Sequence, residues 1–346
     1  MFGIGMTQAG KNGRATILDV AREANVSVGS VSNVLNGTRP VSRKLREQVL
    51  AAATRLNFSI NTVAATLRRR RSGVIGFCTT YATTVYLREL ADELDKMATD
   101  NGYDLIQVFT RQDPELELRR VRSLIARQVD GLILLPSLQP AAALEAVREA
   151  GTPLVIVDRR VDPRFDTITV ANHAAMGLVV KRLRALGHRR LLFIPQNRWV
   201  MTTQERIKAL EDAAATCAEF SFEILERGQE KPHFVEALRM TLAKDMAPTA
   251  IVTGNSSVAL WTVEALQQLG RRWPDDVSLV TFDEPEWTSL LSPPVASIAA
   301  PTRAMAERVW QALVDRLAEA DRAPVDERMM ATLDMRGSIG PAPPNN

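Results

Sequence analysis

The stretch 15–36, ATILDVAREANVSVGSVSNVLN, constrains this chain more than any other, because it predicts two short helices with only three residues between them. Thr16 is placed to cap the first helix, and Asp19 three positions later completes a capping box. Ser27 is placed to cap the second helix. Helices joined so closely, at 25–27, must turn sharply and pack against each other as a helix-turn-helix. The sequence therefore predicts a unit of the kind that reads DNA.

The apolar residues of this stretch and of the segment after it recur at helical spacing, so one face of each helix is expected to turn inward. Ser42 is placed to cap a third helix that closes a small core. The expected core residues are Ile17, Val20, Ala21, Ala24, Val31, Val34, Leu35, Leu45, Val49, Ala52 and Leu56. The second helix then presents Val28, Gly29, Ser32 and Asn33 to the major groove. The alternative is a small helical subdomain without a nucleic-acid role.

The charge of the chain is concentrated at its N-terminal end. Residues 1–72 hold 12 lysines and arginines against 3 acidic residues, whereas the remaining residues hold 31 against 37. The formal net charge of +3 therefore hides a basic end and an acidic body. Such asymmetry indicates a polyanionic partner for one end only. This favours DNA binding by the three-helix unit at 15–59, which we name the headpiece.

Length and composition favour a globular protein of two domains or more. The chain has 346 residues, of which 46% are hydrophobic and 24% charged. Cys78 and Cys217 lack metal-ligand spacing and are expected to be buried as small hydrophobic residues. No apolar run reaches the roughly 20 residues of a membrane helix, and the first residues lack the pattern of a secretion signal. We expect a cytoplasmic protein without cofactor, metal or membrane, with flexible tails at 1–14 and 341–346.

The segment 60–73 joins the headpiece to the body. Asn61 is placed to cap a helix that ends at Leu67, which is too short to be stable alone. We expect this hinge helix to order on DNA, where Val63, Ala64 and Leu67 form an apolar ridge that wedges into the minor groove. The arginines at 68–71 would then lie against phosphates. A solvated basic linker is the alternative.

From residue 74 onward, predicted strands alternate with amphipathic helices in two series. The first series has strands at 74–79, 104–109, 131–135 and 154–157, and helices at 84–101, 113–127 and 141–150. The second has strands at 190–194, 250–252 and 278–281, and helices at 173–186, 202–218, 233–243 and 256–269. Alternation with short connections is typical of a parallel sheet with helices on both faces. Ligands of such sheets bind at the carboxyl ends of the strands.

Seven motifs occur in order along the chain. They are TILDVAREANVSVGSVSNVLNG at 16–37, NTVAATL at 61–67, VDGLILLP at 129–136, LVIVDRR at 154–160, ALGHRRLLFI at 185–194, PDDVSLVTFDE at 274–284 and SPPVASI at 292–298. On these motifs the chain resembles, over essentially its whole length, the lactose repressor and galactose repressor (LacI/GalR) family of bacterial transcription regulators.

The resemblance implies a small all-α helix-turn-helix headpiece and an α/β core of two doubly wound lobes, similar to periplasmic binding proteins. The core would span 74–340, with lobe 1 at about 74–170 and 302–329 and lobe 2 at about 171–301 and 330–340. A homodimer or tetramer would bind a pseudo-palindromic operator and lie on the nucleoid when bound. A sugar, a sugar derivative or a nucleobase-like effector would bind between the lobes.

The resemblance also assigns DNA contacts by position. They are Val28, Gly29 and Asn33 for base reading, Thr16 and Ser32 for phosphates, and Ala64 and Leu67 for the minor groove. Asn33 is a departure, because many family members carry arginine there. An asparagine amide pairs with adenine, whereas arginine suits guanine, so the operator is expected to differ. Ile60 replaces a usual proline and makes the entry to the hinge less rigid.

For the effector, the resemblance points to Arg206, on the helix after the first strand of lobe 2, and to Asp283 in TFDE. A guanidinium and a carboxylate facing one pocket can bind vicinal hydroxyls or a planar heterocycle. Further candidates near strand ends are Tyr81, Thr84, Tyr86, Asp158, Trp199, Thr202, Asn255 and Trp287. The aromatic members could stack on a ligand ring.

Structural roles are the alternatives for these side chains. Arg206 could tie its helix to an acid, Asp283 could cap the next turn, and Tyr86 and Trp287 could serve packing. Three departures from the family pattern leave the ligand class open. Ser256 stands where the family often has aspartate, and Ala209 replaces the family's glycine after the arginine. The loop TYATT lacks the family's usual acidic residue.

An enzyme would need a reactive constellation, and the sequence shows none of the common signatures. It has no GxGxxG opening a helix, no phosphate loop with GK[ST], no GxSxG elbow and no clustered ligand set. His173, His188 and His233 are expected in capping or surface roles. A transport-type binding protein would carry an export signal in place of the headpiece, and a non-specific architectural DNA-binding protein would not need two ligand lobes. The sequence therefore predicts a ligand-controlled DNA-binding regulator.

Overall fold

The structure is a computed structural model that describes residues 15–36, 39–56, 58, 72–81, 84–226, 228 and 230–343. It divides into two compact units, Met1–Ser72 and Gly73–Asn346. Ala64, Leu67 and the rest of the expected hinge helix lie outside the described residues. No helix within the described ranges combines the length and the apolar character needed to cross a bilayer.

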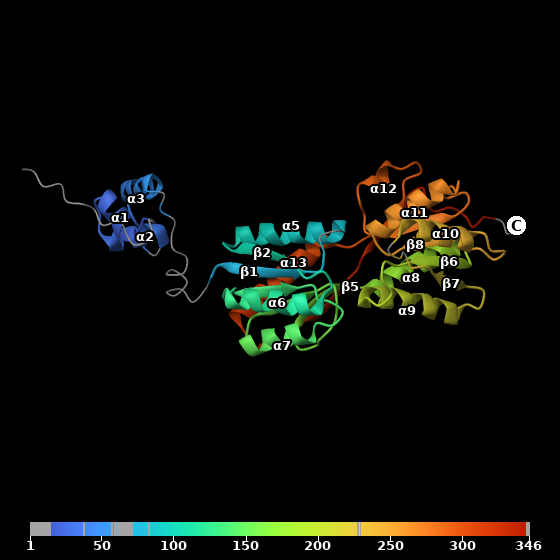
Figure 1. Ribbon diagram of the computed structural model, residues 1–346, viewed down its shortest axis with the longest axis horizontal. Helices are drawn as coiled ribbons and strands as arrows, with labels where there is room; N and C mark the ends of the chain where they lie inside the picture. The colour runs from blue at the N-terminus through green and yellow to red at the C-terminus, as the bar shows by residue number, and fades with distance from the viewer. Residues whose placement is uncertain are drawn as a thin grey trace, which may run out of the picture. The chain divides into compact units, whose positions relative to one another are not determined.

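The first unit contains the predicted helix-turn-helix, formed by α1 (Ile17–Glu23) and α2 (Val28–Asn36), followed by α3 (Arg43–Arg55) (Figure 1). The capping box at Thr16 is confirmed, because its hydroxyl accepts from Asp19 N at 3.3 Å and its backbone N–H donates to the Asp19 carboxylate at 2.8 Å. Ser27 and Ser42 accept hydrogen bonds from backbone N–H groups three positions later. Asn25, at φ 49°, makes the turn in the left-handed region that asparagine tolerates.

A small apolar core holds the three helices together. Its buried members are Val20, Ala21, Ala24, Val31, Val34, Val49, Ala52 and Ala53, with Ile17, Leu35, Leu45 and Leu56 packed against them. Every core residue that the periodicity predicts is among these. The Gln48 amide adds a 2.7 Å hydrogen bond to the carbonyl of Ala24, which links α3 to the end of α1.

The second unit contains two six-stranded sheets, one in each lobe (Figure 1). The lobe 1 sheet is wholly parallel, in the order β11-β5-β4-β3-β1-β2. Its strands are β1 (Val74–Thr79), β2 (Asp104–Phe109), β3 (Gly131–Leu134), β4 (Leu154–Val157), β5 (Asp166–Val170) and β11 (Asp326–Met329). Its helices are α5 (Val85–Asp100), α6 (Pro114–Ala126), α7 (Ala141–Ala150) and α13 (Thr302–Ala318).

Successive residues of β1 show that both faces of this sheet are covered. Phe77 packs into the core that includes α5 and α13, whereas Cys78 packs into the core of α6 and α7. A strand that is buried on both faces loses the apolar and polar alternation of an exposed sheet. This accounts for the continuous apolar runs at 131–135 and 154–157.

The lobe 2 sheet has the order β12-β10-β9-β8-β6-β7, with only β12 antiparallel among the described strands. Its strands are β6 (Arg190–Ile194), β7 (Ser221–Ile224), β8 (Ala250–Thr253), β9 (Ser278–Phe282), β10 (Ala296–Ala299) and β12 (Thr332–Asp334). Its helices are α8 (Asn172–Ala185), α9 (Met201–Thr216), α10 (Lys231–Leu242), α11 (Ser256–Gln268) and the short α12 (Trp287–Leu290). The predicted α/β class with two doubly wound lobes is confirmed.

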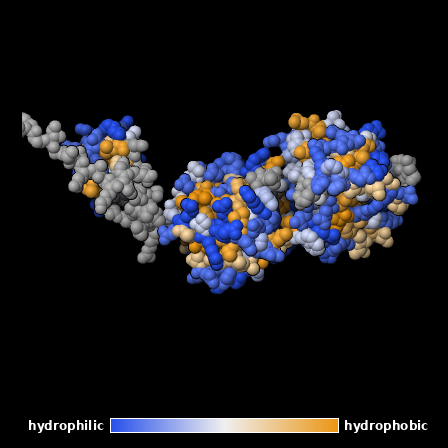
Figure 2. Space-filling model, viewed as in Figure 1, coloured by the Kyte–Doolittle hydropathy of each residue, from blue (hydrophilic) through white to orange (hydrophobic). Residues whose placement is uncertain are grey.

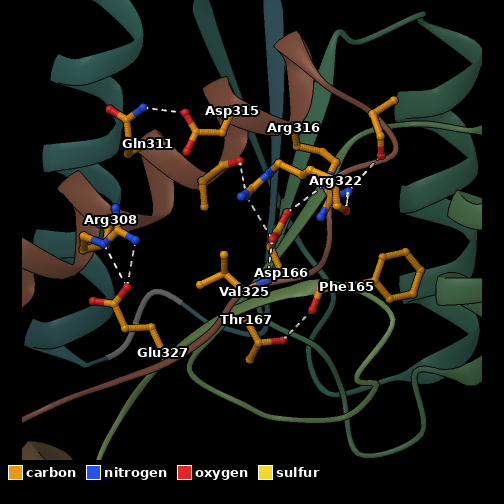
Figure 3. A network of polar contacts seen from close by, with 12 residues as sticks. Phe165, Asp166, Thr167, Arg308, Gln311, Asp315, Arg316, Arg322, Val325 and Glu327 are labelled. Carbon is orange, nitrogen blue, oxygen red and sulfur yellow. Dashed lines mark hydrogen bonds and ion pairs between the residues drawn. The ribbon is translucent and has the colours of Figure 1, made fainter.

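Asp166 fastens the C-terminal return of the chain to lobe 1. Its side chain is fully buried at the start of β5. One carboxylate oxygen accepts from Arg316 Nε at 2.9 Å, and the other accepts from Arg322 Nη2 at 3.0 Å and Val325 N at 2.8 Å. Figure 3 shows both guanidinium groups converging on this carboxylate. One acid thus joins β5 to α13 and to the loop that leads into β11.

A buried polar cluster also holds the C-terminal segment against lobe 2. His188 is 1% exposed, and its ring nitrogens contact Thr249 Oγ1 at 2.9 Å and the carbonyl of Gly340 at 3.0 Å. Burial lowers the pKa of His188, although the bond to Gly340 opposes this shift. The prediction of a capping or surface role for His188 is therefore wrong. Beyond it, Ala342 N donates to the carbonyl of Leu186, so hydrogen bonding continues past residue 340.

Candidate nucleic-acid interface and ligand cleft

The N-terminal end of α2 places the predicted base-reading positions on its surface. Val28 is 39% exposed and Gly29 is exposed, while Ser32 and Asn33 one turn later are half-buried. The Ser27 hydroxyl accepts from Ser30 N at 3.1 Å and so caps this end. A helix whose N-terminal residues face outward while its other face packs on the core has the form of a major-groove reader.

Thr16 has a structural role beside its expected phosphate contact. It is exposed at the start of α1, and its hydroxyl lies 2.6 Å from the carboxylate of Asp19. These hydrogen bonds from Thr16 lower the pKa of Asp19. The N-terminus of a helix directs free N–H groups outward, which suits a phosphate. Thr16 therefore stabilises the helix end at which such a contact would form.

In the core, Asp158 and Asp283 occupy equivalent places in the two lobes. Asp158 directly follows β4 and Asp283 directly follows β9. Both residues are left-handed, at φ 72° and 67°. The backbone N–H of Asp158 donates to Ile168 O in β5, and that of Asp283 donates to Ile298 O in β10. In each sheet, one central strand is therefore followed by an aspartate with the same left-handed backbone conformation.

Arg206 links the segments that follow β5 and β8. Its Nε donates to the Asn172 side chain at 2.8 Å, and its Nη1 donates to the carbonyl of Gly254 at 2.7 Å. The guanidinium carbon lies 3.5 Å from the ring centroid of Phe282. Burial lowers the pKa of Arg206 to about 10, while Asp283 and Asp158 oppose this shift. It stays charged at neutral pH.

Four of the predicted effector residues share one electrostatic environment. Burial raises the pKa of both Asp158 and Asp283, and Arg206 opposes the shift in each. Burial also raises the pKa of Tyr86, and the two carboxylates raise it further. The structure therefore brings Tyr86 of lobe 1, Asp158, Arg206 and Asp283 together at the carboxyl ends of the two sheets, where such folds bind ligands.

A cavity of about 290 Å³ adjoins this group. Tyr86 and Asp283 belong both to the group and to the cavity wall. The other lining residues come from α5, from the segment around α12, from the β10–α13 connection and from the segment after β12; they are Val85, Glu89, Glu284, Pro285, Glu286, Ser289, Ala299, Ala300, Thr302 and Arg336. Segments of both lobes thus enclose one space.

Other predicted effector residues are engaged in local structure. Tyr81 donates to the carbonyl of Arg111 at 2.8 Å. Thr84 caps α5, and Asn255 caps α11 while its amide donates to Gln196 at 2.7 Å. Trp287 packs against the apolar core beneath α10 and α11.

The remaining candidates lie on or beside α9. Thr202 is four residues before Arg206, and residues at that spacing share a helix face. Trp199 is 70% exposed in the loop before α9, and the Arg198 guanidinium lies over its ring at 5.5 Å.

Sequence reasoning missed several residues of the cleft. Asn172 follows β5 and Gly254 follows β8, so both could have been found at strand ends, but the polar strand 166–170 was not recognised. Gly254 is also sterically constrained, since a Cβ there would lie 3.0 Å from Pro195 Cα. Glu89 and Glu286 carry no sequence signal that distinguishes them from other surface acids.

Within the described part of the chain, no group of three or more histidine, cysteine or acidic side chains is placed to hold a metal ion. His173 pairs with Asp212, and His233 lies beside Glu230. Cys78 is buried and Cys217 is half-buried, both as free thiols.

Comparison with known proteins agrees with these two units. Residues 16–61 match the family described as bacterial regulatory proteins, lacI family, and residues 180–339 match a periplasmic binding protein-like domain. The HTH-type transcriptional repressor PurR of Mannheimia succiniciproducens is 30% identical over 314 residues, which cover 89% of this chain and 93% of that protein. The ribose operon repressor of Haemophilus influenzae is 29% identical over 307 residues, which cover 88% of this chain and 92% of that repressor.

Among solved structures, a Lac repressor dimer bound to operator and an anti-inducer has the same fold, with a TM-score of 0.81. It is 24% identical, and the match covers 94% of this chain and 99% of that one. Relatives named as transcriptional repressors match nearly the full length of the chain, so it is a DNA-binding transcription regulator and not an enzyme. The chain belongs to the lacI family of bacterial regulatory proteins.

Proposed function

We propose that this protein is a transcriptional repressor that binds a pseudo-palindromic operator as a homodimer and responds to a small effector bound between its lobes. The observation that carries the effector role is the meeting of Tyr86, Asp158, Arg206 and Asp283 beside a cavity enclosed by both lobes. The effector would be a sugar, a sugar derivative or a nucleobase-like molecule. The protein would act in the cytoplasm, on DNA of the nucleoid.

On DNA, each subunit would place α2 in the major groove of one half-site. Val28, Gly29 and Asn33 would contact base edges, while Ser32 and Thr16 would contact phosphates. Ala64 and Leu67 of the paired hinge segments would enter the minor groove between the half-sites. The basic charge of residues 1–72 supports binding to a polyanion.

Replacing Asn33 with alanine is expected to relax base preference at one position of each half-site, because an amide pairs bidentately with adenine. The expected loss is about 1–3 kcal/mol against the preferred base pair. Affinities for operators with each base at every position would measure it. Ser32→Ala is the matched control, since loss of a phosphate contact weakens binding about equally on all sequences. An Asn33→Ala protein with the wild-type preference at every position would contradict the assignment.

The effector would contact Arg206, Asp158 and Asp283 through hydrogen bonds. Tyr86 lies near these groups, Thr202 lies on α9 with Arg206, and Asn255 caps α11. Tyr81, Thr84 and Trp287 would join the ligand contacts if the lobes closed. Ligand-biased choice between two lobe arrangements would set the spacing of the headpieces.

A homodimer is supported by apolar side chains left on the surface of lobe 2. Figure 2 shows an apolar patch over α12. Leu290, the last residue of α12, is 83% exposed, and Leu260 of α11 is 44% exposed. An exposed apolar patch of this kind commonly marks a protein interface. Assembly of two dimers into a tetramer is a further outcome that light scattering would detect.

The decisive experiment selects bound sequences from a pool of random DNA duplexes with the full-length protein. The proposal expects an enriched sequence with two inverted half-sites, and a ligand that changes affinity for it. Because coupling is reciprocal, the operator must change ligand affinity by the same factor. Enrichment of no sequence over competitor DNA would instead indicate an architectural DNA-binding protein.

A further inference from the structure

The cavity beside the effector group has a wall of four acidic residues. Glu89 comes from α5 of lobe 1, whereas Asp283, Glu284 and Glu286 come from the segment between β9 and α12 of lobe 2. We name these four residues the acidic wall. They face one space of about 290 Å³, near the lower end of the range for small-molecule sites, which is about 300–1,000 Å³. The space therefore suits a small ligand.

The arginine in the described wall of the cavity is already engaged. Arg336, the only basic residue among the described lining residues, pairs with Glu284 and Asp334 and also donates to Thr288 Oγ1 at 2.9 Å. Glu89, Asp283 and Glu286 form no ion pair with any residue that the structure describes. Arg206 and Arg88 act on Asp283 and Glu89, but neither lines the cavity, so the described lining carries four acidic side chains against one arginine.

Mutual repulsion among these carboxylates is visible at Glu89. Burial raises the pKa of Glu89, and Glu286 and Asp283 raise it further, while Arg88 opposes them. Asp158 likewise raises the pKa of Asp283. A positive charge in the cavity would relieve this repulsion from both lobes at once, because carboxylates from each lobe face it.

Tyr86 adds a feature that acidic side chains alone lack. Its half-buried ring lines the same cavity, and its hydroxyl lies 3.7 Å from the Met305 sulfur. An aromatic ring beside carboxylates is the combination with which proteins bind ammonium groups, because the ring face attracts a cation. Arg206 nearby can bind hydroxyl oxygens of the same ligand.

We propose that the effector is a small hydroxylated amine, such as an amino sugar or an amino polyol, whose ammonium group binds between Glu89, Asp283 and Glu286 beside Tyr86. This inference rests on the proposed function, in which the cleft is the effector site. It excludes sugar phosphates and other anions, since their charge would be repelled by the acidic wall. A cation held by acids of both lobes would also favour the closed lobe arrangement.

The test uses the full-length protein and a panel of ligands matched in shape but not in charge. Glucosamine, glucose and glucose 6-phosphate form one set, and galactosamine, galactose and galactose 1-phosphate form another; putrescine and butane-1,4-diol form a third. Calorimetry and thermal unfolding would measure binding. At least one amine is expected to bind about tenfold or more tightly than its neutral counterpart, to weaken as salt rises, and to change operator affinity. The phosphates are expected not to bind.

Variants of the acidic wall test where the ammonium group of the ligand binds. Glu89→Gln and Glu286→Gln should each weaken amine binding about two- to fivefold, with little effect on the neutral counterpart. Asp95→Asn is the control, because it removes one exposed charge from α5 away from the cavity. A neutral or anionic ligand that binds more tightly than every amine, or a panel in which no amine binds, would overturn this inference. The proposed function fails separately, if no ligand of any charge alters binding to the selected operator.

Discussion

Asp166→Ala is expected to lower the free energy of unfolding of the core by about 3–5 kcal/mol. The substitution leaves Arg316 and Arg322, 13% and 17% exposed, without the carboxylate that pairs with both. It also removes the acceptor of Val325 N. An uncompensated buried charge costs more than the ion pair contributes, so the loss should exceed that of any exposed pair. Urea unfolding followed by circular dichroism would measure it.

Glu307→Ala is the matched control for this prediction. Glu307 pairs with Arg303 on the exposed side of the same helix, α13, and its loss should cost about 0.5 kcal/mol or less. Because Asp166 holds the chain where it returns to lobe 1, its loss should also expose the segment 319–329 to proteolysis. Equal stabilities for the two variants would show that the buried cluster does not fasten this segment.

Arg206→Ala is expected to abolish the effect of effector on operator binding while leaving the operator affinity of the free protein unchanged. Coupling between ligand sites is typically about 1–3 kcal/mol, or roughly 5- to 150-fold in affinity, and the variant should retain almost none of it. The physical reason is that Arg206 donates to both Asn172 and Gly254, which follow strands β5 and β8. Without it, ligand contacts in the cleft no longer act on both strand ends.

The measurement is operator affinity with and without a ligand found in the panel, together with ligand affinity by calorimetry. Lys208→Ala is the control, since Lys208 lies on the exposed side of α9 and pairs with Asp212. A folded, dimeric Arg206→Ala protein that has lost operator binding itself would contradict the division between headpiece and core. So would a variant that still responds fully to the ligand.

The headpiece could be predicted almost residue by residue, because its determinants are local. Caps at Thr16, Ser27 and Ser42 depend on hydrogen bonds across three positions, and the core follows from helical spacing. The central strands of the core were predictable for a similar reason. Burial on both faces requires continuous apolar runs such as 131–134, which stand out against polar connections.

The edge of lobe 1 could not be predicted in this way. The strand Asp166–Val170 has the sequence DTITV and begins with a charged residue. Asp166 could not be buried without the hydrogen bonds that Arg316 and Arg322 donate to it. Those partners lie 150 and 156 positions later in the chain, so no local pattern signals them. The strand Asp326–Met329 pairs with it and carries the exposed and half-buried residues of a sheet edge.

The candidate cleft was predictable in part. Asp158 and Asp283 follow apolar strands, which places them at the carboxyl edge without any knowledge of the fold in space. The acidic wall is different, because Glu89 lies on a helix of one lobe and Glu286 follows a strand of the other. Only the packing of the two lobes reveals that they share a cavity.

The left-handed turns at Asp158 and Asp283 restrict how this cleft can change during evolution. Outside glycine, asparagine and aspartate are the residues that adopt such a backbone at low cost. Exchange of aspartate for asparagine at either position would remove one negative charge and leave the turn intact. A bulky or β-branched residue would disturb the turn as well as the ligand. Descendants of this protein could therefore alter the charge of the molecule they sense by single substitutions, while the framework that reports it stays unchanged.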